Sequence, residues 1–511
     1  MELIFFTFCY VLSFAASVHG LYAVSGCILT AAAAALGLYY FIKDGRRICP
    51  PAVFSVSWAG GVGISCFKLS RLETDWELIT WICFWLAFIS FITGYKFIHG
   101  KLTDKKSIIT AYSGSEYACV RKNTSSCESL TGSEDLSESD TGKAHETDDN
   151  ISGIFAERET QAEPILYMMN ILAAVSLISL IAEGCIIGYI PLFTKDMPHA
   201  YSYFHVSGLH YFTVSCVLLP ALGCIYLKLT GMTAFAAMKS YRKLDVSACM
   251  LLGVFIPVLL VSRYQMLFGL MLAFFTLLIM NGAKINIRIN RRVLGGIFIS
   301  AAVLITLYVF ITIERAHSVE YLNGIFEMKN AKMPIFISQP YIYIANNFDN
   351  FNCLVRELDE FTHGLRMLFP VFALTGLKFI YPELTAFPIF VTKEELTTVT
   401  LIYDSYYDFG IIGVVVFCML LGAAFALLEH KTLGFTETAG KSVKGSIKST
   451  GCFAVLLYAQ LCIYLALSFF TTWFSNPTTW FYIGLTLTGW AFCSFLNKRR
   501  QDVNGLQRRK L

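Results

Sequence analysis

Long apolar runs recur along the whole 511-residue chain, and they constrain its fold more than any other feature. A helix needs about 20 apolar residues to cross a bilayer, where every backbone polar group must be satisfied internally. With 56% hydrophobic and 15% charged residues, a soluble fold of this length cannot bury so many apolar side chains. The sequence therefore predicts an all-α polytopic membrane protein with about twelve spans, near residues 3–19, 21–43, 51–67, 78–98, 165–187, 209–229, 246–262, 265–281, 293–313, 409–428, 450–470 and 478–496.

The first apolar run lacks the basic residues and the cleavage site of a signal peptide, so we expect it to be retained as the first span. Most of the 16 cysteines lie inside apolar runs, where cysteine behaves as a small hydrophobic residue. The sequence contains no CxxC pair or Cys/His cluster that indicates a metal site. We therefore expect no bound metal.

Basic residues are concentrated in alternate short connections between the spans, which predicts the orientation of the chain. Short cytoplasmic loops are enriched in Lys and Arg, so these connections and both termini are assigned to the cytoplasm. The opposite connections, residues 19–20 and 471–479, contain no Lys or Arg. The basic connections are "KDGRR" (43–47), "KSYRKLD" (239–245), "KINIRINRR" (284–292), "KSVKGSIK" (441–448) and "NKRRQ" (497–501).

Two long loops divide the spans into groups. Residues 107–163 are rich in Ser, Thr, Glu and Asp, and we expect a disordered cytoplasmic loop because such a segment buries too little apolar surface to offset its ordering entropy. Residues 314–408 mix aromatic, proline and charged residues, which favours a structured extracytoplasmic loop. The expected order is spans one to four in 1–106, the loop 107–163, spans five to nine in 164–313, the loop 314–408, spans ten to twelve in 409–496, and a basic cytoplasmic tail in 497–511.

The segment "LDEFTHGLRMLFP" (358–370) lies in this second loop, and its neighbourhood shows helical periodicity. Over residues 354–368 the spacing predicts an amphipathic helix that lies flat on the outer membrane surface. A plain interfacial helix with solvated charges is the simpler interpretation. The apolar face holds Leu354, Leu358, Phe361, Leu365 and Leu368, and the polar face holds Arg356, Asp359, Glu360, His363 and Arg366.

Other charged residues are expected at the same outer height. Arg263 lies in a tight outer turn, Arg315 follows Glu314 directly after the ninth span, and Glu183 lies within a span. Arginine at such a turn can also extend into lipid headgroups, and Glu314 can pair with Arg315. A carboxylate inside a bilayer is costly, and it usually faces a polar cavity or a partner.

These residue types suit a lipid-linked pyrophosphate. Guanidinium groups bind phosphate oxygens through a planar fork and keep their charge, and a histidine can remove a proton from a hydroxyl. We therefore expect His363 and Arg263 to be catalytic, and Arg315, Arg366, Arg356, Glu183 and Tyr343 to bind substrate. Tyr341, Tyr343, Tyr403, Tyr406 and Tyr407 can stack on sugar rings or form an interfacial aromatic belt.

Several motifs, in order, resemble a known family. They are "GYIPLF" (188–193), "HAYSYFHVSGLHYF" (199–212), "SRYQMLFGLMLAFF" (262–275), "YIYIANNFDNFN" (341–352), "FTHGLRML" (361–368) and "YYDFGIIGVVVF" (406–417). The chain resembles the bacterial oligosaccharide repeat-unit polymerases, the Wzy-type O-antigen and capsule polymerases, from about residue 50 to its end. The cytoplasmic loop is an exception, and the arginine-glycine loop motifs of the family are not cleanly reproduced.

The resemblance implies a GT-C-like enzyme at the outer face of the bacterial cytoplasmic membrane. Such an enzyme uses undecaprenyl pyrophosphate-linked oligosaccharides and transfers the growing glycan to the non-reducing end of a new repeat, without metal, cofactor or nucleotide sugar. It implies pyrophosphate contacts for Arg263, Arg315 and Arg366, and by likeness to the O-antigen ligases a base role for His363. Membrane lipids, a chain-length regulator and a flippase are the implied partners, and nucleic acid is not.

Three other functions remain open. A ligase passes the glycan to a different acceptor, and acceptor identity cannot be inferred from the sequence. A flippase for lipid-linked oligosaccharides has a similar number of spans, but it usually shows repeated halves and charges along a path through the membrane. This sequence shows no internal repeat, and its charges gather at one surface. A purely structural membrane protein leaves Glu183 and the arginine residues unexplained.

Overall fold

The fold is described here from a computed structural model of the chain. The structure describes residues 1–45, 47–122, 143–194, 200–231, 235–236, 238–283, 319–441 and 449–508. Within these ranges only the backbone is described for residues 104–122, 143–161, 319–321, 323, 434–441, 449–450, 497 and 500–508. Every regular element in the described ranges is helical, and Ser70 and Met328 form an isolated antiparallel bridge.

Among the described residues, seven helices are long and apolar enough to cross a membrane. The prediction of an all-helical membrane protein is therefore confirmed. The helices that contain these segments are α2 (Tyr22–Lys43), α5 (Leu78–Lys122), α6 (Lys143–Ile187), the continuous run of α8 (Leu209–Val214), η3 (Ser215–Leu218) and α9 (Leu219–Thr230), α12 (Arg263–Met280), α18 (Tyr403–Lys441) and α20 (Pro477–Arg508).

The expected number of about twelve spans is not confirmed. Two apolar helices, α1 (Glu2–Val18) and α19 (Ser449–Ala466), are shorter, and α11 (Ser240–Leu259) begins with charged residues. The run expected at 51–67 is divided into α3 (Pro50–Phe54), a π-helical turn η1 (Ser55–Ala59) and α4 (Gly60–Ser65). The run expected at 293–313 lies outside the described residues.

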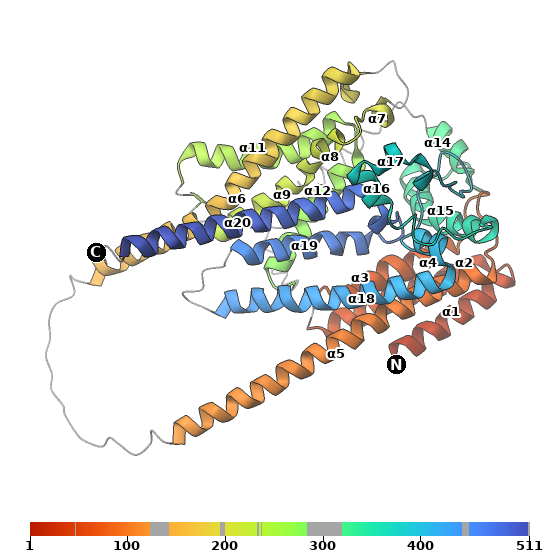
Figure 1. The fold of residues 1–511 in the computed structure, drawn as a ribbon. Coiled ribbons are helices and arrows are strands. Elements are labelled where there is room, and N and C mark those ends of the chain that lie inside the picture. Colours follow the sequence, from red (N-terminus) through yellow and green to blue (C-terminus); the bar gives the residue numbers. More distant parts are fainter. Residues whose placement is uncertain are drawn as a thin grey trace.

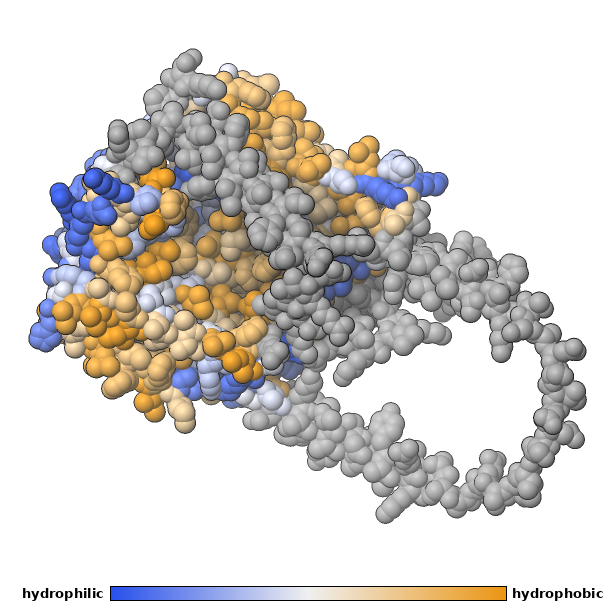
Figure 2. Space-filling model, turned by 180° about the vertical axis from the view of Figure 1, so that it is seen from behind, coloured by the Kyte–Doolittle hydropathy of each residue, from blue (hydrophilic) through white to orange (hydrophobic). Residues whose placement is uncertain are grey.

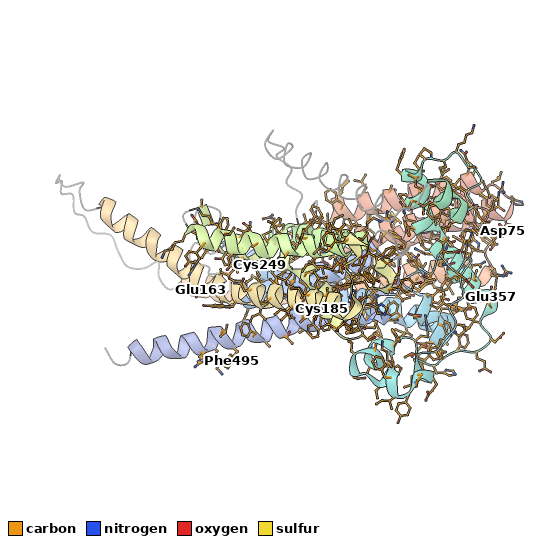
Figure 3. All side chains as sticks on the ribbon, turned by 90° about the horizontal axis from the view of Figure 1, so that it is seen from above. Asp75, Glu163, Cys185, Cys249, Glu357 and Phe495 are labelled. Carbon is orange, nitrogen blue, oxygen red and sulfur yellow. The ribbon has the colours of Figure 1, made fainter. Side chains whose placement is uncertain are left out.

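Helix α15 and several short helices gather at one end of the helix bundle (Figure 1). They are α7 (Ala200–Tyr203), α14 (Val319–Phe326), α15 (Ile335–Glu357), α16 (Phe369–Thr375) and α17 (Leu377–Ile380). We call this the loop end. Seen from above, Asp75 and Glu357 lie at the loop end, and Glu163 and Phe495 lie toward the opposite end (Figure 3).

The ends of the bundle are consistent with the predicted alternation. The chain starts on the side away from the loop end, and α20 runs away from the loop end to the C-terminus (Figure 1). Apolar side chains cover much of the described surface between the two ends (Figure 2). Such a surface suits the hydrocarbon of a bilayer. The assignment of the loop end to the extracytoplasmic face stays a prediction from the charge pattern.

Helices α5 and α18 pack backbone to backbone, and two glycines permit this. A Cβ atom at Gly94 would lie 2.1 Å from the carbonyl oxygen of Met419, and one at Gly422 would lie 2.1 Å from the carbonyl oxygen of Phe91. Small residues at helix contacts allow this close approach in membranes, where dispersion contacts replace the hydrophobic effect. The contact fixes α18, whose first turns belong to the loop end.

The segment 107–163 differs in part from the expectation. The backbone is helical as far as Lys122 in α5 and again from Lys143 in α6, and residues 123–142 lie outside the described residues. Lys, Glu and Ala residues occur in both helical extensions, and these residue types favour helix. Disorder of residues 123–142 stays a prediction.

The prediction of an amphipathic helix over residues 354–368 is wrong. Helix α15 ends at Glu357, and the chain then turns irregularly, with positive φ angles at His363 (+51°) and Gly364 (+105°). The backbone N–H groups of Thr362 and His363 donate to the carbonyl oxygens of Tyr407 and Asp408 instead of to a helix of their own. Docking on α18 therefore overrides the local 3.6-residue periodicity.

We predict that Gly94→Ala destabilises the protein, because the added methyl group forces α5 and α18 apart. Overpacking of this kind costs about 1–3 kcal/mol, so the thermal midpoint of the purified protein in detergent should fall. Gly100→Ala is the matched control in the same helix, since a Cβ atom there meets nothing within 4 Å. Equal midpoints for the two variants would refute the close contact.

Candidate functional site

Buried polar side chains at the loop end form three clusters. The Asp349 network joins α15 to the connection between α4 and α5. The Asp408 cluster joins the 361–368 segment to the start of α18. The Glu183 cluster lies where α6 ends and α8 begins. Together the three clusters show which charged groups are committed to the fold.

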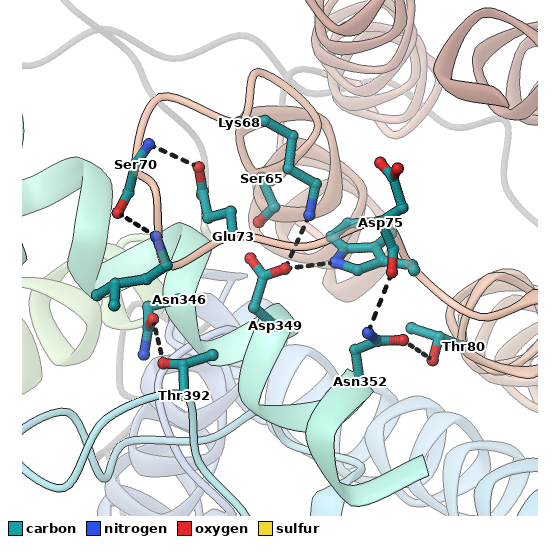
Figure 4. A network of polar contacts seen from close by, with 12 residues as sticks. Ser65, Lys68, Ser70, Glu73, Asp75, Thr80, Asn346, Asp349, Asn352 and Thr392 are labelled. Atoms are coloured by element: carbon teal, nitrogen blue, oxygen red, sulfur yellow. Dashed lines mark hydrogen bonds and ion pairs between the residues drawn. The ribbon is translucent and has the colours of Figure 1, made fainter. Parts of the chain in front are cut away.

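The Asp349 network is centred on a desolvated ion pair (Figure 4). Lys68 Nζ lies 2.8 Å from Asp349 Oδ1, and both side chains are buried. Trp76 Nε1 donates to the same oxygen at 2.8 Å, and the ammonium of Lys68 lies 4.4 Å from the centre of a Trp76 ring. Removing one partner of a buried pair leaves an uncompensated charge, so this network holds α15 in place.

Glu73 belongs to the same network but has a different charge state. Tyr341 donates its hydroxyl to Glu73 Oε1 at 2.6 Å, and the N–H of Ser70 donates to Oε2 at 2.8 Å. Burial, and then the nearby charge of Asp349, raise the pKa of Glu73 to about 8. Glu73 therefore holds its proton near neutral pH, and Asp349 balances the charge of Lys68.

The polar face of α15 continues as a row of buried asparagines that bind backbone. Asn350 donates to the carbonyl oxygens of Leu396 and Thr398, and Asn347 donates to the carbonyl oxygen of Phe469. Buried amides satisfied in this way fix the chain segments they contact. These side chains hold the loop end together and do not point to a ligand.

The Asp408 cluster explains the shape of the segment around "THGLRM". Asp408 accepts hydrogen bonds from the N–H of Arg366 at 3.1 Å, from the N–H of Met367 at 2.8 Å and from the hydroxyl of Thr362. Arg366 donates from Nε and Nη2 to Asp404 Oδ1 at 2.9 and 2.7 Å. Its guanidinium also lies 5.1 Å from the centre of the Tyr407 ring. The charge of Arg366 is thus already balanced within the chain.

His363 and Arg356 do not share a helical face, because that helix is absent. Both side chains are exposed, Arg356 in the last turn of α15 and His363 in the following turn. Within the described part of the chain, the His363 ring makes no hydrogen bond or ion pair. Asp359 and Glu360, expected to orient that ring, are exposed as well. Arg315 lies outside the described residues.

The Glu183 cluster contains a carboxylate–imidazole pair. Glu183 is fully buried, four residues before the end of α6, and both of its oxygens lie 3.2 Å from His210 Nδ1. Thr213 donates its hydroxyl at 2.7 Å and Val206 its N–H at 3.0 Å. The partner expected for a carboxylate at this position is therefore present, and it is a histidine.

His210 was not singled out from the sequence as a functional residue. It lies 27 residues after Glu183, and neither residue carries a motif that indicates the other. One signal in the sequence could have indicated His210. This residue lies at the start of an apolar run, at the membrane height expected for the outer end of the span that contains Glu183. A polar partner for an intramembrane carboxylate is best sought at that height.

Arg263 lies next to the same stretch of chain. It is half-buried, and it starts α12 after the N-cap residue Ser262. On either side of Arg263, Val261 and Met266 are buried and pack against Leu192 and Tyr201. These two residues belong to the described parts of the 188–208 connection, whose Val206 is bound by Glu183. One connection thus holds both the Arg263 turn and the Glu183 cluster.

A row of aromatic rings runs from the Arg263 turn to α15. The ring centre of Tyr264 lies 6.3 Å from that of Phe470, and Phe470 lies 6.1 Å from Tyr343. Tyr343 is half-buried on α15. The structure therefore places Arg263, Glu183 and Tyr343 on connected elements, whereas Arg366, Arg356 and His363 belong to the α15–α18 corner.

An apolar cavity of about 490 Å³ extends along the bundle as far as α15. Its lining runs from the last turns of α2, near the opposite end, along α3, η1 and α4 to Ile344 of α15. From Ala52 to Ile64 the helical path alone covers about 18 Å at 1.5 Å per residue. The described lining residues are Gly37, Phe41, Ile48, Ala52, Val53, Val56, Ser57, Gly61, Ile64, Phe275, Ile344, Ala466 and Phe469.

Comparison with known proteins adds no further assignment. Neither protein-family models, nor curated proteins, nor solved structures gave a match to this chain. In the part of the chain that the structure describes, no group of three or more His, Cys, Asp or Glu residues is arranged to hold a metal ion.

We predict that Glu73→Gln makes the protein more stable at pH 8 and flattens its pH dependence. Folding raises the pKa of Glu73 from 4.5 to about 8, so its contribution to stability is full below pH 4.5 and is lost as the pH rises through 8. Glutamine resembles the protonated acid and cannot ionise. Thermal midpoints of both proteins between pH 5 and 8.5 check this, and parallel curves would contradict the buried-acid assignment.

We predict that Asp408→Ala releases the 361–368 segment from α18. The substitution removes the acceptor for two backbone N–H groups and one hydroxyl, and each buried donor left unsatisfied costs about 1–3 kcal/mol. Hydrogen exchange at residues 362–368 should become faster. Asp359→Ala, at an exposed position nearby, is the control and should leave this exchange unchanged.

Proposed function

We propose that this protein polymerises undecaprenyl pyrophosphate-linked oligosaccharide repeat units into O-antigen, capsule or exopolysaccharide. The observation that carries the proposal is the apolar cavity whose lining runs along the bundle and reaches Ile344 of α15. A polyprenyl chain needs an apolar path of this orientation, with its pyrophosphate at the polar end. The loop end then faces outward from the bacterial cytoplasmic membrane, in agreement with the charge pattern.

Arg263 is the best described candidate for the pyrophosphate contact. Tyr264 directly follows Arg263, and the ring of Tyr264 begins the row of aromatic rings that reaches Tyr343. A guanidinium group suits phosphate oxygens because its donors form a planar fork. Arg315 is proposed for the same role from the sequence. Arg366 is proposed for the same role from the sequence, and two of its donors contact Asp404.

The proposed reaction is a direct displacement at the sugar carbon that is linked to pyrophosphate. The hydroxyl at the non-reducing end of a new lipid-linked repeat attacks that carbon, and the lipid pyrophosphate leaves with the bonding electron pair. Tyr343 is proposed to contact the first sugar beside the pyrophosphate. The chemistry of this step is shared by a ligase, which differs in its acceptor.

The reaction is tested with purified protein in vesicles and a synthetic lipid-linked repeat unit as both donor and acceptor. A ladder of glycans on lipid, with one free lipid pyrophosphate released per bond, is expected. Release without a ladder, but with transfer to a second acceptor lipid, would favour the ligase. Movement of intact repeat units across the vesicle membrane without bond formation would favour the flippase.

We predict that Ala52→Trp slows the reaction with a long polyprenyl donor more than with a donor of one or two isoprene units. Ala52 lines the cavity and is buried, so the indole takes space that the tail would occupy. The apparent KM of the long donor should rise at least tenfold, while that of the short donor changes little. Ile412→Trp, at a position on α18 that is 73% exposed, is the control for a bulky substitution elsewhere. An equal effect on both donors would contradict binding of the tail in this cavity.

A further inference from the structure

We propose that His210, oriented by Glu183, is the general base that removes the proton of the acceptor hydroxyl. This inference rests on the proposed transfer reaction and names a residue for its proton step. The exposed His363 would be the base by family resemblance, but the helix expected to orient it is absent. The Glu183 cluster supplies the orientation that His363 lacks.

The geometry of the pair determines which nitrogen is available. A carboxylate only accepts hydrogen bonds, so the proton of the neutral imidazole lies on Nδ1, which faces both oxygens of Glu183 at 3.2 Å. The lone pair is then on Nε2. A carboxylate that fixes the tautomer and stabilises the imidazolium is the arrangement that makes histidine an effective base.

Glu183 is buried and His210 is partly exposed, as is required of a general base and the carboxylate that orients it. Glu183 is fully buried and held by Thr213 and Val206 as well, so the carboxylate has a fixed position. The side chain of His210 is 29% exposed and is open to an incoming hydroxyl. A carboxylate needed only to fasten the 204–210 segment would not require a partly open imidazole.

Among the described residues, a second histidine lies near the pair. The ring of His205 lies 6.5 Å from that of His210 and is exposed, and it makes no contact with Glu183. On the α20 side, the neighbouring Tyr211 and Phe212 pack against Phe481. The 188–208 connection links this pair to the Arg263 turn, so base and pyrophosphate contact lie on one structural unit.

The step is balanced in atoms and charge. The acceptor oxygen forms a bond to the anomeric carbon while the bond from that carbon to the pyrophosphate oxygen breaks, and the leaving pyrophosphate keeps the electron pair. The hydroxyl proton moves to Nε2 of His210. The imidazolium, stabilised by Glu183, then releases the proton to water, which returns the neutral base.

The test compares His210→Gln with the wild-type protein in the ladder assay, at equal amounts of folded protein. Loss of a positioned base costs about 10²- to 10⁴-fold in rate, so glycan bond formation should fall by that factor. His205→Gln is the matched control and should retain the wild-type rate. His210→Ala should be partly restored by added imidazole, which a purely structural histidine would not show.

Glu183→Gln tests the positioning role through the pH profile. Glutamine can still accept from Thr213, but it lacks the negative charge that stabilises an imidazolium. The acid limb of the rate should move to lower pH and the maximum rate should fall. A lower rate with an unmoved limb would show that Glu183 only holds the fold.

The possible outcomes separate the two proposals. Wild-type protein that forms no glycan bond overturns the proposed function, and this inference falls with it. A wild-type ladder together with a full-rate ladder from His210→Gln overturns only the inference. A ladder lost in His363→Gln but kept in His210→Gln would return the base role to His363.

Discussion

The ion pair between Lys68 and Asp349 is the interaction on which the loop end depends. Both side chains are buried, so each charge is tolerated only because the other is present. The pair fixes α15 against the connection before α5, and α15 in turn supplies Ile344 to the cavity and Tyr343 to the row of aromatic rings. The proposed site for a lipid-linked substrate at this end of the bundle therefore depends on a charge pair whose residues do not line the cavity.

Charged residues at the loop end fall into two groups with different roles. Asp408, Asp404 and Arg366 satisfy one another and the backbone, so their charges are used by the fold. Glu183 is also satisfied, but one of its partners is a histidine that remains partly open to solvent. The distinction lies in the charges and in the open nitrogen: the charge of Arg366 is balanced by Asp404, whereas the imidazole of His210 keeps one nitrogen free of Glu183. This difference favours the Glu183 cluster over the Asp408 cluster as a site of chemistry.

The membrane helices were predictable because an apolar run of bilayer length has few alternatives to a spanning helix. The need of the Glu183 carboxylate for a partner was also predictable, because a carboxylate inside a bilayer is costly. The amphipathic helix over 354–368 was not correct, although its periodicity is present in the sequence. Asp408, about 40 residues downstream, offers acceptors that local spacing does not reveal, and Gly364 permits the turn that reaches them. His210 was missed for the same reason, since its pairing with Glu183 exists only after α6 and α8 come together. The membrane spans thus follow from local sequence pattern, whereas the arrangement of the candidate site depends on contacts between distant segments.

The central claim is that a polyprenyl tail occupies the apolar cavity while its pyrophosphate lies at the loop end. The most direct measurement is a structure of the protein in a lipid nanodisc with bound undecaprenyl pyrophosphate-linked repeat unit. We expect the tail between Ala52 and Ile344 and the pyrophosphate beside Arg263. A tail bound on another face of the bundle, or a pyrophosphate at the opposite end, would contradict this account.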